Sequence, residues 1–152
     1  MRTHATFTAD QFETGLAPDA PLEVVPGREL AGWLAAELGG AAGLVVGPPI
    51  RQEWGWELGL QVGAQAVSLT VALVPAHVPA WLVAALPVVA IRRRHSGRVD
   101  QLALERVLRA LHDLLSRAAG IRQLGWHEAA AFDRGVADPA ATPFTLPSSE
   151  RA

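Results

Sequence analysis

The sequence predicts an α+β fold: a single two-layer domain in which two helices pack on one face of a mainly antiparallel sheet of about four to five strands. Between residues 53 and 74, large apolar side chains alternate with small or polar ones, with the two-residue period of a strand. No helical segment separates these strands, which is typical of antiparallel sheets. A leucine-rich segment with helical spacing follows at residues 100–120. The chain has 152 residues, half of them apolar, which is enough for one substantial core.

The domain is expected to begin at residue 27. Residues 1–26 show no strong periodicity and contain three prolines, so we expect a weakly ordered N-terminal segment that could include an edge strand. A short helix is predicted within residues 26–40, because its apolar residues fall on one helical face and two glycines follow it. Those apolar residues are Leu30, Trp33, Leu34 and Leu38.

Residues 53–62 and 66–74 are predicted to form the two strands of a hairpin, joined near Gly63–Gln65. One face of the first strand is expected to be core and carries Trp54, Trp56, Leu58, Leu60 and Val62. The opposite face carries Glu53, Gly55, Glu57, Gly59 and Gln61. In the second strand Val67, Leu69, Val71 and Leu73 share the core face.

The apolar run from Ala66 to Ile91 is long enough for a membrane span, but two features argue against one. Three prolines divide it into pieces of strand length, and its first part alternates. We therefore expect a third strand over residues 81–91, apolar on both faces because it is central in the sheet. A short helix over residues 79–86 is the competing prediction.

The clearest element is the helix at residues 100–120, which Asp100 can cap and Gly120 ends. Its buried stripe is expected to contain Leu104, Val107, Leu108, Leu111, Leu115 and Ala118. Its solvent face carries charges of alternating sign at Glu105, Arg109, Asp113 and Arg117. A last strand is predicted over residues 121–126, and residues 128–152 are expected to form a proline-containing tail.

Several kinds of chemistry find no support in the sequence. There is no cysteine or tyrosine, no glycine-rich phosphate loop and no G-x-S-x-G motif. His127 and Glu128 begin a zinc-protease-like motif, but Ala131 stands where the second histidine is required. A formal net charge of −2 does not favour nucleic acid as a partner. We therefore expect no catalytic residues, cofactor, metal or nucleic-acid partner, although a small enzyme using Glu, Arg and His is an open alternative.

Two surfaces are candidates for binding another protein. Glu53, Glu57 and Gln61 share the polar face of the first hairpin strand, where interleaved glycines leave room for a partner. Arg92 and Arg94 belong to a basic cluster at the end of the third strand. We predict these five residues as partner-binding residues.

The EWGWEL segment at residues 53–58, the hairpin, the tryptophan-containing apolar strand, the leucine-rich helix and the closing Gly125–Trp126 resemble a pattern found in small bacterial α+β proteins. Some of these are immunity proteins of polymorphic toxin systems. The resemblance covers residues 27–127 and implies a cytoplasmic, non-catalytic protein that binds and neutralises a toxin. An N-terminus without an apolar signal core is consistent with that location. An adaptor or secretion chaperone that forms a homodimer and binds secreted clients is the alternative.

Overall fold

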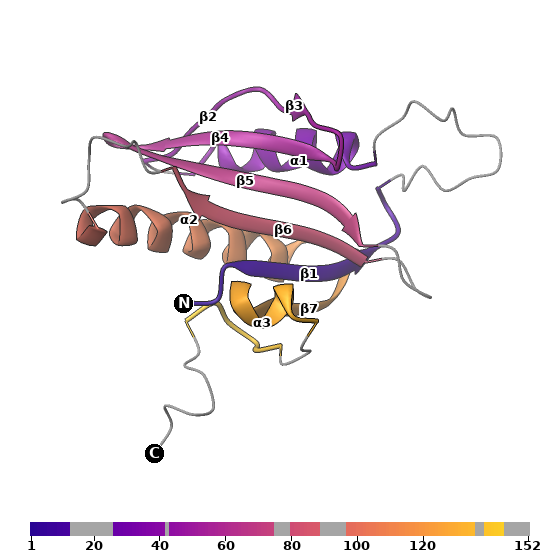
Figure 1. The fold of residues 1–152 in the computed structure, drawn as a ribbon. Coiled ribbons are helices and arrows are strands. Elements are labelled where there is room, and N and C mark those ends of the chain that lie inside the picture. Colours follow the sequence, from indigo (N-terminus) through magenta and orange to yellow (C-terminus); the bar gives the residue numbers. More distant parts are fainter. Residues whose placement is uncertain (13–25, 42, 75–79, 89–96, 136–138, 145–152) are drawn as a thin grey trace, which may run out of the picture.

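The computed structural model describes residues 1–12, 26–41, 43–74, 80–88, 97–135 and 139–144, without the side chains of residues 97–100. It shows an α+β fold built on one open antiparallel sheet (Figure 1). The strands are β1 (His4–Ala9), β2 (Val45–Val46), β3 (Ile50–Arg51), β4 (Trp56–Val62), β5 (Gln65–Val74), β6 (Ala80–Pro87) and β7 (Ile121–His127). The helices are α1 (Arg28–Leu38), α2 (Gly97–Arg117) and α3 (Ala129–Asp133). The sheet has seven strands, so the predicted number of four to five is too low.

The strand order is β2–β4–β5–β6–β1–β7, and β3 also pairs with β4. The N-terminal strand β1 therefore lies inside the sheet, between β6 and β7, rather than at an edge. Ala5 and Phe7 of β1 point into the core and are almost fully buried. The sheet thus includes residues upstream of residue 27, where the sequence places the start of the domain.

The predicted hairpin is confirmed: β4 and β5 pair antiparallel from Trp56–Val71 to Val62–Gln65. Gly63 in the turn has φ of 61°, a left-handed conformation that glycine adopts easily. Residues 80–87 form a strand that pairs with β5 on one side and β1 on the other, so the alternative of a short helix there is wrong. None of the helices in the described part of the chain is long and apolar enough to cross a membrane.

The core lies between one face of the sheet and helices α1 and α2. Helix α1 contacts β4, helix α2 contacts β4, β5, β6 and β7, and the two helices contact each other. From α2 the core takes Leu104, Val107, Leu108, Leu111 and Leu115, all in the predicted stripe. The helix begins at Gly97, so Asp100 lies in its first turn instead of preceding it as a cap.

Helix α3 packs on the other face of the sheet, at the end formed by β1 and β7. Its Phe132 ring lies 5.2 Å from the ring of His4 and 5.6 Å from that of His127. These histidines are cross-strand partners on the face opposite Ala5 and Trp126. One end of the second face is therefore covered, whereas β4, β5 and β6 carry no described helix on that face.

Candidate protein-binding site

The uncovered face of β2 to β6 has exposed aliphatic side chains on both sides, and its middle combines small residues such as Gly59 and Ser68 with the longer Glu57 and Gln61. We call this surface the open face. It consists of Val45, Ile50, Glu57, Gly59, Gln61, Ala66, Ser68, Thr70, Leu86 and Val88. Cross-strand register places these side chains together, because residues paired across an antiparallel ladder point to the same side.

Three rows of paired residues define the open face. The first runs from Val45 through Gln61 to Ala66, whose carbonyl accepts a hydrogen bond from the amide of Val88. The second joins Gly59, Ser68 and Leu86. The third runs from Ile50 through Glu57 to Thr70, whose partner on β6, Ala84, is buried.

Exposed apolar side chains are concentrated on the open face. Of the seven large hydrophobic residues that are exposed in the described part of the chain, four lie here. They are Val45 (68% exposed), Ile50 (55%), Val88 (53%) and Leu86 (46%). They stand on one sheet face, two on each side of β4 and β5, and several exposed aliphatic side chains on one face indicate an interaction site more strongly than single ones do.

Glu57 supplies the charge in the middle of this face. Its Oε2 accepts a hydrogen bond from Gln52 Nε2 at 3.0 Å, and its Oε1 accepts one from Ser68 Oγ at 2.9 Å. Both donors are neutral, and Glu57 forms no salt bridge with any residue that the structure describes. The carboxylate is therefore held in a fixed position, and no residue in the described part of the chain supplies a compensating positive charge.

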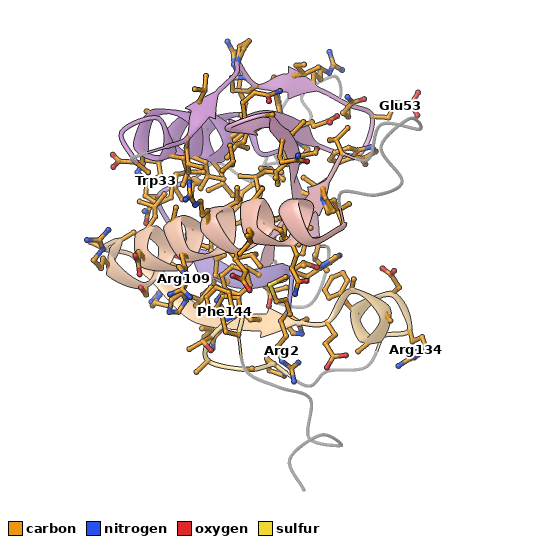
Figure 2. All side chains as sticks on the ribbon, turned by 90° about the vertical axis from the view of Figure 1, so that its left-hand side faces the viewer. Arg2, Trp33, Glu53, Arg109, Arg134 and Phe144 are labelled. Carbon is orange, nitrogen blue, oxygen red and sulfur yellow. The ribbon has the colours of Figure 1, made fainter. Side chains whose placement is uncertain are left out.

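The other predicted site residues are placed differently. Gln61 lies exposed on the open face, as its position in the strand predicts. Glu53 is also exposed, but it precedes β4 in a bend and is not part of the strand face (Figure 2). Arg92 and Arg94 lie outside the described residues. The aliphatic residues from β2, β3 and the end of β6 were not predicted.

The prediction that Trp54 belongs to the core is wrong, because its side chain is 50% exposed. Gly55, between the two tryptophans, lies so close to β5 that a Cβ there would collide with the carbonyl oxygen of Val71. The strand starts only after this contact, at Trp56, so the alternation does not extend back to Trp54. Trp56 is half-buried and packs near Gly27 at the start of α1.

The covered end of the same face contains a compact group of histidines. Thr6 Oγ1 lies 2.7 Å from His127 Nε2, and both His4 and His127 are buried beneath Phe132. Burial lowers the pKa of His4 below its ordinary value of 6.5, and Asp133 opposes that shift. Glu128 forms a salt bridge of 3.8 Å with the buried Arg2 instead of pairing with His127. These contacts attach α3 to the sheet.

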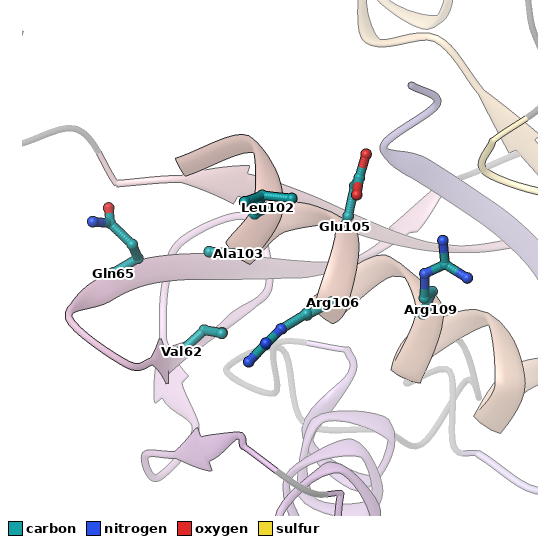
Figure 3. Close-up of a pocket in the computed structure, with 7 residues that line it drawn as sticks. All are labelled: Val62, Gln65, Leu102, Ala103, Glu105, Arg106 and Arg109. Carbon is teal, nitrogen blue, oxygen red and sulfur yellow. The ribbon is translucent and has the colours of Figure 1, made fainter. Parts of the chain in front are cut away.

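A second candidate surface lies on the helix side. A pocket of about 410 Å³ is lined by Val62, Gln65, Leu102, Ala103, Glu105, Arg106 and Arg109, which Figure 3 draws in close-up. An adjoining depression of about 610 Å³ shares Arg106 and Arg109 but also includes Glu37 and Asp113. Arg109 stacks on Phe144, 4.9 Å from the ring centre (Figure 2). Charges of both signs line this surface, as predicted for a solvated helix face, so it has no clear preference for one ligand charge.

No protein-family model, no curated protein and no solved structure matches this chain. Its function is therefore inferred from its own geometry.

Proposed function

We propose that the protein is a non-catalytic binding module that holds another protein against the open face of its sheet. The observation that supports this is the position of Val45, Ile50, Leu86 and Val88, four exposed aliphatic residues that flank β4 and β5 on one uncovered face. Burying the exposed part of each aliphatic side chain would contribute about 1 kcal/mol. Four such contacts contribute about 4 kcal/mol, which is at the lower end of the entropy cost of association, so further contacts around them must supply the net affinity.

Glu57 supplies the orientation of the partner. A carboxylate with no salt-bridge partner among the described residues can attract a basic side chain of another protein, and such pairs contribute more to specificity and association rate than to affinity. A second copy of this chain would bring another Glu57 to the interface rather than a cation. The charge of the open face therefore favours a different protein over self-association.

The kind of binding module that we propose is an immunity protein, in line with the resemblance of residues 27–127 to immunity proteins of polymorphic toxin systems. A toxin with an apolar surface and a basic residue would satisfy both the aliphatic flanks and Glu57. The adaptor or chaperone that binds secreted clients as a homodimer is the competing function, and it differs in requiring a dimer.

Two glycines provide a matched test. A Cβ at Gly59 on the open face, or at Gly32 on the exposed side of α1, would meet no atom within 4 Å. The variants Gly59→Arg and Gly32→Arg therefore add the same charge and bulk at sites that can accept them. A partner captured with the wild-type chain, identified by mass spectrometry and then purified, is titrated against each variant by calorimetry.

We expect Gly59→Arg to weaken binding by about tenfold or more, which corresponds to about 1.4 kcal/mol. Gly32→Arg should bind like the wild type. Equal affinities for wild type and Gly59→Arg would place the interface elsewhere and refute the proposal. The homodimeric adaptor would be favoured by a different result. Light scattering would show a wild-type dimer that Gly59→Arg disrupts, and the affinity for any captured partner would be unchanged by the variant.

A further inference from the structure

We infer that the element bound on the open face is an amphipathic α-helix of the partner, lying along β4 and β5 with a basic side chain at Glu57. This inference rests on the proposed function, since it assigns the form of the partner at the same surface. The geometry of the face, the state of the sheet edges and the position of the charge each support it.

The width of the open face fits a helix. Its flanks stand on β2 and β3 at one side and on β6 at the other, with β4 and β5 between them. Three strand spacings separate the flanks, which is about 14 Å. An α-helix with its side chains is about 10–12 Å across. A helix therefore fits between Val45 and Ile50 on one side and Leu86 and Val88 on the other.

The low side chains around Gly59 allow such a helix to approach the sheet closely there, between the longer Glu57 and Gln61 along β4. Gly59, Ala66 and Ser68 occupy adjacent positions on β4 and β5, and the space above Gly59 is empty to 4 Å from a Cβ. In the second row a second sheet would meet the low Gly59 and Ser68 beside the taller Leu86, which would leave this part of the face poorly filled. A convex helix fills this shape better.

Strand addition at the sheet edges has less support. At one edge, β2 and β3 contain only two residues each. At the other edge, the amide and carbonyl of Trp126 in β7 already exchange hydrogen bonds of 2.8 Å with Ala140. A β-bulge between Thr6 and Thr8 also interrupts the pairing of β1 with β7. Neither edge offers a long, regular ladder to an extended peptide.

Glu57 determines where the partner's charge must lie. It stands on β4, between Ile50 and Thr70 in the third row, and its hydrogen bonds to Gln52 and Ser68 hold it on the floor of the face. A lysine or arginine at the border of the apolar stripe of the helix can reach this carboxylate. The expected partner segment thus carries an aliphatic stripe with one basic residue beside it.

A display library of stapled helical peptides of about 18 residues, or five turns, tests the inference without the natural partner. The peptides are randomised on one helical face and selected on the full wild-type chain. A matched library with the same randomised residues on a β-branched, extended scaffold is selected in parallel. Each recovered peptide is then measured against wild type, Gly59→Arg, Gly32→Arg and Glu57→Gln.

We expect helical binders with an aliphatic stripe and a lysine or arginine, weakened about tenfold or more by Gly59→Arg and not by Gly32→Arg. Glu57→Gln should weaken them several-fold, and replacing the basic residue of the peptide by glutamine should abolish that difference. If binders came only from the extended library and were weakened by Gly59→Arg, the inference of a bound helix would be wrong. The proposed function would still stand, because the open face would still be the binding surface. Helical binders whose affinity is unchanged by Gly59→Arg would also contradict the inference that a helix binds the open face. The proposed function would be refuted only if the natural partner bound Gly59→Arg as tightly as the wild type.

Discussion

The indoles of Trp54 and Trp56 lie two residues apart but in different surroundings, because Gly55 between them lies against the backbone of β5. Strand alternation alone predicts that both are core. The pattern fails at Trp54 because a strand boundary depends on a long-range contact, that of Gly55 with Val71, which local spacing does not encode. The same alternation correctly places Leu58, Leu60 and Val62 in the core, and Glu57 and Gln61 on the opposite face.

Tryptophan substitutions should separate these environments. Trp126 is fully buried, and its Nε1 donates a hydrogen bond of 3.1 Å to His112 Nδ1. Trp126→Ala should therefore lower the free energy of unfolding by about 3–5 kcal/mol. Trp54→Ala should lower it by less than about 1 kcal/mol, because half of that side chain is already in water. Urea denaturation of both variants measures the two losses, and equal losses would show that Trp54 is structural after all.

His4 should make stability depend on pH. Burial disfavours its charged form, so its pKa in the folded chain is lower than the ordinary value of 6.5. Below that ordinary value the unfolded chain binds a proton that the folded chain resists, so stability is lost as pH falls. Asp133 partly offsets the effect, since its charge raises the pKa.

Chemical denaturation at pH values from 8 down to 5 measures this dependence. We expect the free energy of unfolding to be level above the ordinary pKa of His4 and to fall below it. The variant His4→Asn should show a smaller fall over the same range. The free energy of unfolding of each protein is plotted against pH and normalised at high pH. If the wild-type and His4→Asn curves then coincide, the loss of stability at low pH comes from groups other than His4.

At the scale of elements, strand β6 shows what a local sequence leaves undecided. The apolar residues 80–87 suit either a strand or a short helix, and the pairing of both edges with β5 and β1 decides for the strand. One of those partners, β1, stands more than seventy residues earlier in the chain. The alternation in His4–Ala9, with Ala5 and Phe7 inside and Thr6 and Thr8 outside, was the available signal for it.

Helix α2 allows a matched comparison of two leucines. Leu108 is fully buried in the core, whereas Leu102 is 55% exposed on the same helix. Leu108→Ala should lower the free energy of unfolding by about 2–5 kcal/mol, through lost burial and the cavity left behind. Leu102→Ala should change it by less than about 0.5 kcal/mol, because alanine is an excellent helix former and the site is in water. Thermal and urea denaturation check both, and a small loss for Leu108→Ala would contradict the packing of this helix face.

At the scale of the whole molecule, the order of elements predicted the α+β class and a sheet with a polar face, but not the complete candidate site. Glu57 and Gln61 followed from the alternation in one strand. Val45 and Ile50 belong to two-residue strands that leave no periodic signal, and Leu86 was assigned to a strand buried on both faces. An open face is a property of the assembled layers, since it depends on where helices are absent as well as on which residues a strand carries.

The N-terminal strand makes the fold depend on both ends of the chain. In the described sheet β7 has β1 as its only strand neighbour, and β1 joins it to β6. Removing residues 1–12 therefore deletes the buried Ala5 and Phe7 and separates β7, with the fully buried Trp126, from the rest of the sheet. We expect the chain of residues 13–152 to lose its cooperative urea transition and the near-ultraviolet circular dichroism of its tryptophans, although it retains all of residues 27–127.

Adding a synthetic peptide of residues 1–12 should restore both signals, because the strand can insert between β6 and β7 without a covalent link. A peptide with Phe7→Asp should fail, since it would bury a charge in the core. The shortened chain would contradict this prediction if it unfolded at the same urea concentration as the full chain. The sheet would then be stable without β1 between β6 and β7, and residues 13–152 would fold independently of the N-terminal strand.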